Sequence, residues 1–257
     1  MFALQAGAQA PARRTNGPAI PRMPDGKPNL NGLWQAMTTA YWNLEDHSAQ
    51  AGPVVQIGAI GAIPAGSGVV EGGTIPYKPE ALAKRKANFA NRLKLDPEVR
   101  CYMPGVPRAT YMPYPFQIVQ SQNDFVISYA YASAARIIQV AKHHEAELDT
   151  WMGTSNGKWE GDTFVVDVTG FNGKPWFDRA GNFATDTLHV VERYSLLDAN
   201  TLNYEATIED PAVFTRPWKI ELPLYRHREK NAHLLDFKCV EFVEELMYGE
   251  IDKKTGQ

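Results

Sequence analysis

The residues with the clearest capacity for chemistry lie close together in the second half of the chain. Asp178 lies in a segment of turn residues, His189 and Arg193 fall on one face of a predicted strand, and Glu205 lies in the next strand. A histidine exchanges a proton near neutral pH, a carboxylate orients its ring, and an arginine holds an oxyanion. The pattern predicts an acid–base site in which His189 transfers the proton, Asp178 orients it and Arg193 binds the substrate.

The same residues have a second interpretation. In the segment 202–209 polar and apolar residues alternate strictly, and Glu205 falls on the polar side. This alternation is typical of a strand with one face in solvent, where charged side chains form a cross-strand ladder. Glu205 is therefore the weaker member of the predicted site, and both interpretations stay open.

Large aromatic residues predict the walls of that site. Tyr129 alternates with small residues in a predicted strand, Tyr114 lies in the Pro-rich approach to the strands, and Trp151 and Trp176 lie near strand ends. A buried tyrosine hydroxyl needs a polar partner, which a ligand cavity supplies. These four residues are the predicted substrate-binding set, although aromatic residues that face a barrel interior can also be plain core.

Motifs for cofactors and metals are absent from the sequence. It has no phosphate loop, no dinucleotide-binding glycine pattern and no zinc-type cysteine spacing, so we expect no cofactor. His143 and His144 are adjacent and would point to opposite faces of a strand, so no metal site is predicted. A net charge of −3, with acids and bases interspersed, argues against nucleic acid as a partner. No apolar run approaches the ~20 residues that span a bilayer.

Short β-prone runs separated by turn residues must position these side chains. They predict a mostly β fold: an antiparallel up-and-down, lipocalin-like β-barrel over residues 115–240, with a sandwich as the alternative. The Gly-x-Trp patterns at Gly32 and Gly157 resemble the first strand of lipocalin-type barrels. The predicted strands are residues 116–120, 125–131, 136–140, 151–159, 163–169, 188–194, 201–209, 218–225 and 234–239.

The flanking segments have other compositions. Residues 1–10 end in Ala-Gln-Ala and predict the remnant of a signal peptide. Residues 11–114 predict an irregular extension packed on the barrel, with one helix over 79–93 that starts at a proline. Within it, the segment 52–73, in which Glu71 is the only charged residue, predicts a loop over the barrel or at a subunit contact, with a lid as the alternative. Residues 241–257 predict a short C-terminal helix and a tail.

The two cysteines, Cys101 and Cys239, are far apart in sequence. They fit either one long-range disulfide or two buried thiols, and export to the periplasm or the medium favours the disulfide.

Several segments resemble a large family of uncharacterised exported proteins of acidobacteria and related soil bacteria. The resemblance extends from about residue 24 to residue 241 and implies export and a single domain, but it implies no activity and assigns no residue a role. The segments that carry it are residues 24–34 (PDGKPNLNGLW), 151–155 (WMGTS), 157–166 (GKWEGDTFVV), 176–181 (WFDRAG) and 188–194 (LHVVERY).

Together these patterns predict an exported β-barrel enzyme that acts on a small aromatic or lipophilic molecule by cofactor-independent acid–base chemistry, by hydrolysis, isomerisation or elimination. Two alternatives share the fold: a non-catalytic small-ligand-binding protein, and a structural or assembly protein that forms a homo-oligomer. A polar triad inside the barrel would favour the enzyme, an all-apolar cavity would favour the binding protein, and a filled barrel with adhesive, exposed edges would favour the assembly protein.

Overall fold

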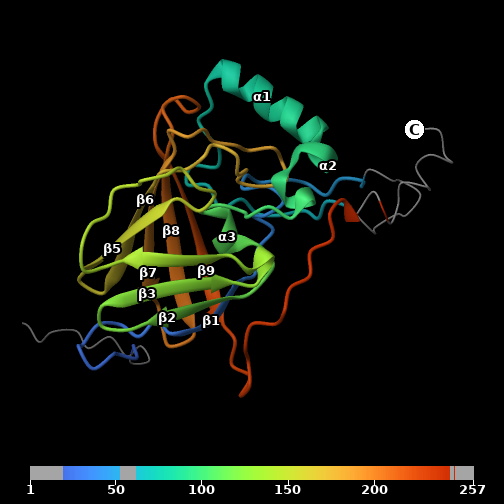
Figure 1. Ribbon diagram of the computed structural model, residues 1–257. Helices are drawn as coiled ribbons and strands as arrows, with labels where there is room; N and C mark the ends of the chain where they lie inside the picture. Colours follow the sequence, from blue (N-terminus) through green and yellow to red (C-terminus); the bar gives the residue numbers. More distant parts are fainter. Residues whose placement is uncertain (1–19, 53–61, 244–245, 247–257) are drawn as a thin grey trace, which may run out of the picture.

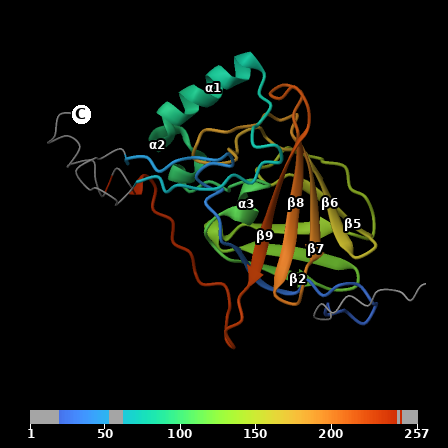
Figure 2. The same cartoon turned by 180° about the vertical axis from the view of Figure 1, so that it is seen from behind.

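The computed structural model describes residues 20–52, 62–243 and 246. In this part of the chain nine strands follow one another in sequence order and close into a barrel (Figures 1 and 2). The elements are β1 (Gly32–Ala36), α1 (Pro79–Ala90), α2 (Arg92–Leu95), the 3-10 helix η2 (Pro97–Arg100), α3 (Arg108–Tyr111), β2 (Phe116–Gln120), β3 (Asp124–Tyr129), the 3-10 turn η3 (Tyr131–Ser133), β4 (Ala135–Gln139), β5 (Thr154–Glu160), β6 (Thr163–Thr169), β7 (His189–Leu196), β8 (Thr201–Glu209) and β9 (Trp218–Arg226).

The predicted mostly β, up-and-down barrel is confirmed, with one parallel step. Nine strands of strictly alternating direction would bring β1 and β9 together in parallel. Because β1 pairs with β9 antiparallel, one other neighbouring pair must be parallel, and this pair is β4 with β5. The connection 140–153 therefore has to cross from one end of the barrel to the other, as parallel neighbours require.

The barrel strands carry the alternation that the sequence predicts. In β8, Leu202, Tyr204, Ala206 and Ile208 are all fully buried, while the residues between them lie on the outer face. β7 alternates in the same way. The interior is therefore built from every second residue of each strand, as in other small barrels.

The barrel begins and ends earlier than predicted. β1 lies inside the segment predicted as an irregular extension, and Trp34 in β1 is fully buried and donates its indole N–H to the carbonyl of Leu30. The predicted strand at 234–239 is wrong, because this segment has no regular secondary structure. β9 already pairs with β8 on one side and β1 on the other, so the barrel is complete at Arg226.

The predicted helix over 79–93 is present but divided. Pro79 starts α1 at its first position, as predicted, and α1 ends at Ala90, where Asn91 leaves helical geometry before α2 begins. Gly181 in the β6–β7 loop adopts a φ of +82° and lies so close to α1 that a Cβ there would come within 2.7 Å of the Arg85 carbonyl oxygen. This close approach fixes α1 on the β6–β7 loop.

The other flanking predictions are tested only in part. The predicted signal-peptide remnant, part of the segment 52–73 and most of the C-terminal helix lie outside the described residues. In the described part of 52–73, Val70 forms a β-bridge with Ile220 of β9, so this part lies along the barrel wall. Among the described residues no helix combines the length and apolarity that crossing a membrane requires.

One end of the barrel is covered by a cap, which we define as α1, α2, η2 and the β6–β7 loop (Figure 1). The segment after β9 runs along the barrel towards this cap (Figures 1 and 2). The predicted disulfide is confirmed there: Cys101, directly after η2, is bonded to Cys239.

Candidate functional site

The residues of the predicted acid–base site do not converge on a pocket. His189 lies on the outer face of β7, its side chain is 37 % exposed, and its Nε2 lies 2.9 Å from Oδ2 of Asp167 on β6. Arg193 lies on the same outer face and forms an ion pair with Glu160 at 2.9 Å. The alternation of β7 turns both side chains away from the interior.

Glu205 lies directly across from Arg193 on β8, also on the outer face. Its carboxylate is 3.6 Å from Nζ of Lys219 on β9. The arrangement is the cross-strand charge ladder that the alternation of β8 also predicts. The prediction that His189, Arg193 and Glu205 point into a pocket is wrong. In β7 and β8 these residues alternate with buried residues and lie on the outer face.

Asp178 lies apart from this ladder, fully buried in the β6–β7 loop. Its carboxylate accepts hydrogen bonds from the backbone N–H groups of Leu44, Ala180 and Asn182 and from the side-chain amide of Asn182. Burial raises the pKa of Asp178 to about 6, and the hydrogen bonds offset only part of that rise. Asp178 therefore joins the N-terminal segment to the β6–β7 loop and does not orient His189.

Tyr129 faces the barrel interior, where it joins a buried ion pair. Arg136 on β4 and Glu192 on β7 lie 2.6 Å apart, with side chains 1 % and 0 % exposed. The guanidinium of Arg136 also donates to the hydroxyl oxygens of Ser155 and Tyr129. A buried charge is tolerated only when it is paired and its hydrogen bonds are made, and both conditions hold here.

The Glu192 carboxylate is saturated by two further tyrosines. The hydroxyls of Tyr194 and Tyr204 donate to its Oε1 at 2.9 and 2.8 Å. Burial, reinforced by the charge of Glu192, raises the pKa of both phenols well above its usual value, so both remain donors. We call Arg136, Glu192, Ser155 and the three tyrosines the interior network. None of the grooves described below includes Arg136 or Glu192 in its lining.

Sequence reasoning missed the interior network, although a signal was present. Glu192 falls in phase with Val190 and Tyr194 on the apolar side of β7, and Arg136 falls in phase with Ile138 on β4. One basic and one acidic residue on the otherwise apolar faces of two strands indicate a buried ion pair.

Tyr114 lies under the cap, half-buried against the C-terminal segment. Its ring packs on Tyr131 and Phe237, with centroids 5.7 and 4.9 Å away. Together the three rings line a small cavity of about 210 Å³ near the disulfide. Because each ring packs directly on the other two, they form a compact cluster.

Trp151 and Trp176, in contrast, line one groove together. Trp151 precedes β5, Trp176 lies in the β6–β7 loop, and the ring of Tyr102 packs on Trp151 with centroids 5.1 Å apart. The groove has a volume of about 540 Å³, within the range of small-molecule sites. Its lining is Lys94, Leu95, Pro97, Arg100, Tyr102, Trp151, Lys174 and Trp176.

The charge of this groove is of one sign. Lys94 comes from α2, Arg100 from η2 and Lys174 from the β6–β7 loop, and none of the described residues that line the groove carries a carboxylate. Among the described residues neither lysine has an ion-pair partner. We call this site the basic aromatic groove.

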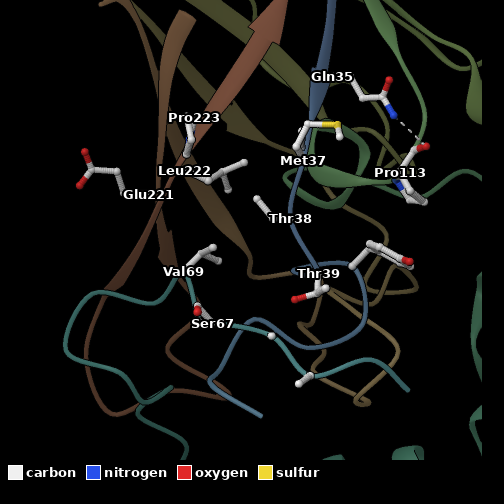
Figure 3. A pocket seen from close by; sticks show the side chains of 15 residues that line it. Gln35, Met37, Thr38, Thr39, Ser67, Val69, Pro113, Glu221, Leu222 and Pro223 are labelled. Atoms are coloured by element: carbon white, nitrogen blue, oxygen red, sulfur yellow. Dashed lines mark hydrogen bonds between the residues drawn. The ribbon is translucent and has the colours of Figure 1, made fainter. Parts of the chain in front are cut away.

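A second, larger groove of about 700 Å³ follows the rim of the barrel (Figure 3). It opens where β1 leaves β9. Ala36 pairs with Leu224, so Met37 would next face Pro223, which has no N–H to continue the ladder. Among the described residues that line this rim groove, Glu221 is the single charged residue and none is a cation, so the rim groove specifies a ligand class less sharply than the basic aromatic groove.

The described residues contain no cluster of three His, Cys, Asp or Glu side chains that could hold a metal ion. No protein-family model matches the sequence, and no curated protein is significantly similar to it.

The interior network generates a prediction about stability. Replacing Glu192 by Leu leaves the Arg136 charge unpaired in the barrel, which we expect to lower the free energy of unfolding by about 3–5 kcal/mol. Urea unfolding followed by tryptophan fluorescence measures it. Glu205→Leu on the outer face is the matched control, expected within about 0.5 kcal/mol. A Glu192→Leu variant as stable as this control would contradict the account.

Asp178 generates a prediction about pH. Its folded-state pKa of about 6 lies above the unfolded value of about 3.9, so between these values the folded protein holds a proton that the unfolded chain has lost. This contribution to stability is complete below about pH 4 and disappears as the pH rises through 6, by roughly 3 kcal/mol in all. Urea unfolding from pH 4 to 7 should show this loss relative to Asp178→Asn. If the wild type instead became more stable relative to the variant as the pH rises from 4 to 7, the folded state would favour the ionised carboxylate of Asp178.

Proposed function

We propose that the protein is a non-catalytic binding protein for a small anionic aromatic molecule, which it holds in the basic aromatic groove. The observation that carries the proposal is the presence of Trp151 and Trp176 in one groove whose described lining has three cations and no carboxylate. Aromatic rings of a ligand stack on indole and phenol faces, and a carboxylate on the ligand pairs with Lys or Arg.

The chemistry of the groove supports binding more than turnover. Among the described residues that line it there is no histidine, carboxylate, serine or cysteine. General acid–base catalysis usually relies on a group that titrates near the working pH, most often a histidine or a carboxylate. The predicted catalytic residues His189, Arg193 and Glu205 form ion pairs on the outer face of the barrel. Asp178 is fully buried in the β6–β7 loop.

The barrel interior gives little support to a lipocalin-type internal ligand. The interior network occupies it with a neutralised ion pair whose hydrogen bonds are made within the protein. An internal ligand would have to compete with these bonds, whereas the basic aromatic groove needs no such exchange.

We also propose that the protein is exported and belongs to the family of exported proteins that the sequence resembles. The disulfide supports this proposal, because disulfides persist in the periplasm and outside the cell and are rare in the cytosol. A homo-oligomer remains a prediction.

Calorimetric titration with benzoate, 4-hydroxybenzoate and naphthalene-2-carboxylate tests the proposal, with the matching neutral alcohols as controls. We expect the carboxylates to bind more tightly and the affinity to fall as salt is raised, because charges near the surface are screened. Equal binding of acids and alcohols, or no binding of any of them, would refute it.

Two variants assign the binding to the groove. Trp151→Ala removes a stacking surface and should weaken binding about tenfold, the equivalent of about 1.4 kcal/mol. Lys174→Glu reverses one cation and should weaken the carboxylates while leaving the alcohols unchanged. Lys230→Glu, an exposed lysine outside the groove lining, is the matched control and should bind like the wild type.

A further inference from the structure

The disulfide lies directly beside the basic aromatic groove. Cys101 separates Arg100 from Tyr102, and both neighbours line the groove. Cys101 adopts a left-handed backbone conformation with a φ of 58°, which is uncommon for a residue other than glycine. Its N–H bonds to the carbonyl of Glu98, and the N–H of Tyr102 bonds to the carbonyl of Pro97. The conformation of Cys101 therefore sets the direction in which Tyr102 leaves η2.

The other half of the disulfide belongs to residues 236–243, which we call the C-terminal strap. The strap has almost no regular secondary structure. Phe237 packs on Tyr114 and Tyr131, and the N–H of Phe242 bonds to the carbonyl of Val99 at 2.7 Å. The disulfide is the covalent anchor of this segment.

The strap also contacts a cation of the groove. The guanidinium of Arg100 lies over the ring of Phe242, 5.6 Å from its centroid. Such a contact restrains a long, exposed side chain that would otherwise sample many rotamers. The strap thus acts on the groove in two ways, through Cys101 on Tyr102 and through Phe242 on Arg100.

We infer that the C-terminal strap positions Arg100 and Tyr102 for the ligand, and that the redox state of the Cys101–Cys239 disulfide controls the affinity of the basic aromatic groove. The inference rests on the proposed function and adds regulation to it. Phe242 and the two cysteines are positioning residues, since none of them lines the groove.

The redox step needs a reductant, for which a small dithiol is sufficient. One thiolate of the dithiol attacks a sulfur of the disulfide and forms a mixed disulfide, and one protein thiolate leaves. The second thiol then attacks the mixed disulfide, which releases the other protein thiolate and a cyclic disulfide. Two electrons pass to the protein, and each protein thiolate takes up a proton. Cys239 is exposed and is therefore accessible to attack.

The test compares the oxidised full-length chain, the same chain reduced by dithiothreitol, and the double variant Cys101→Ser with Cys239→Ser. Naphthalene-2-carboxylate is the probe, titrated by calorimetry. We expect reduction and the double variant to weaken binding by roughly threefold to tenfold, because Arg100 and the ring of Tyr102 would no longer be held in position. The barrel should stay folded, as the far-UV circular dichroism spectrum would show.

A third variant keeps the inference testable if the double variant does not fold. Phe242→Ala leaves the disulfide intact and should weaken the carboxylate more than the matching alcohol, because it releases only the cation. Lys238→Ala is the matched control on the strap, since this exposed residue pairs only with Asp236 in the described chain. In NMR spectra, reduction should shift the Trp151 indole resonance, which reports Tyr102, and leave that of the buried Trp34 unchanged.

The outcomes separate the two proposals. If the oxidised protein binds none of the aromatic carboxylates, the proposed function fails and the regulation fails with it. If the oxidised and reduced proteins bind with equal affinity while both are folded, the proposed function stands and the regulation is wrong. Weaker binding after reduction, with an unchanged barrel and an unaffected Lys238→Ala control, supports both.

Discussion

The ion pair between Arg136 and Glu192 is the interaction on which the rest of the structure depends. Two opposite charges lie in the middle of a barrel whose other inward residues are largely apolar, and neither charge reaches solvent. Each is stable there only because the other neutralises it and because Ser155 and the tyrosines complete the remaining hydrogen bonds. The polar groups of the interior therefore stabilise the fold and are already paired with one another. We accordingly expect a ligand to bind at the surface of the barrel.

The surface site is a consequence of how the barrel closes. Antiparallel closure of nine strands requires one parallel neighbour pair, and the connection that makes it brings Trp151 to the start of β5. The β6–β7 loop adds Lys174 and Trp176, and α2 with η2 adds Lys94 and Arg100. Three segments that are distant in sequence thus form one groove. The disulfide after η2 then ties this groove to the end of the chain.

The sequence predicted the barrel well, because strand alternation and turn residues are local properties. The runs at 116–120 and 201–209 coincide with β2 and β8. The site was harder to predict. Alternation shows that His189 and Arg193 share a face with each other but not whether that face points inwards, and this depends on neighbouring strands. Asp178 was misread for a related reason, since one of its hydrogen-bond partners, the backbone N–H of Leu44, is 134 residues away in the sequence. Trp151 and Trp176 do share a groove, but its cations come from elements whose packing no local pattern reveals.

Mapping of a bound aromatic carboxylate by amide and indole chemical shifts tests the central claim most directly. The proposed ligand lies on the outside of the barrel, at the cap. We therefore expect naphthalene-2-carboxylate to perturb the resonances of the groove residues and to leave those of Tyr129, Glu192 and Tyr204 unchanged. The groove residues are Arg100, Tyr102, Trp151, Lys174 and Trp176. Perturbations centred on the interior network, with an unchanged basic aromatic groove, would contradict this expectation.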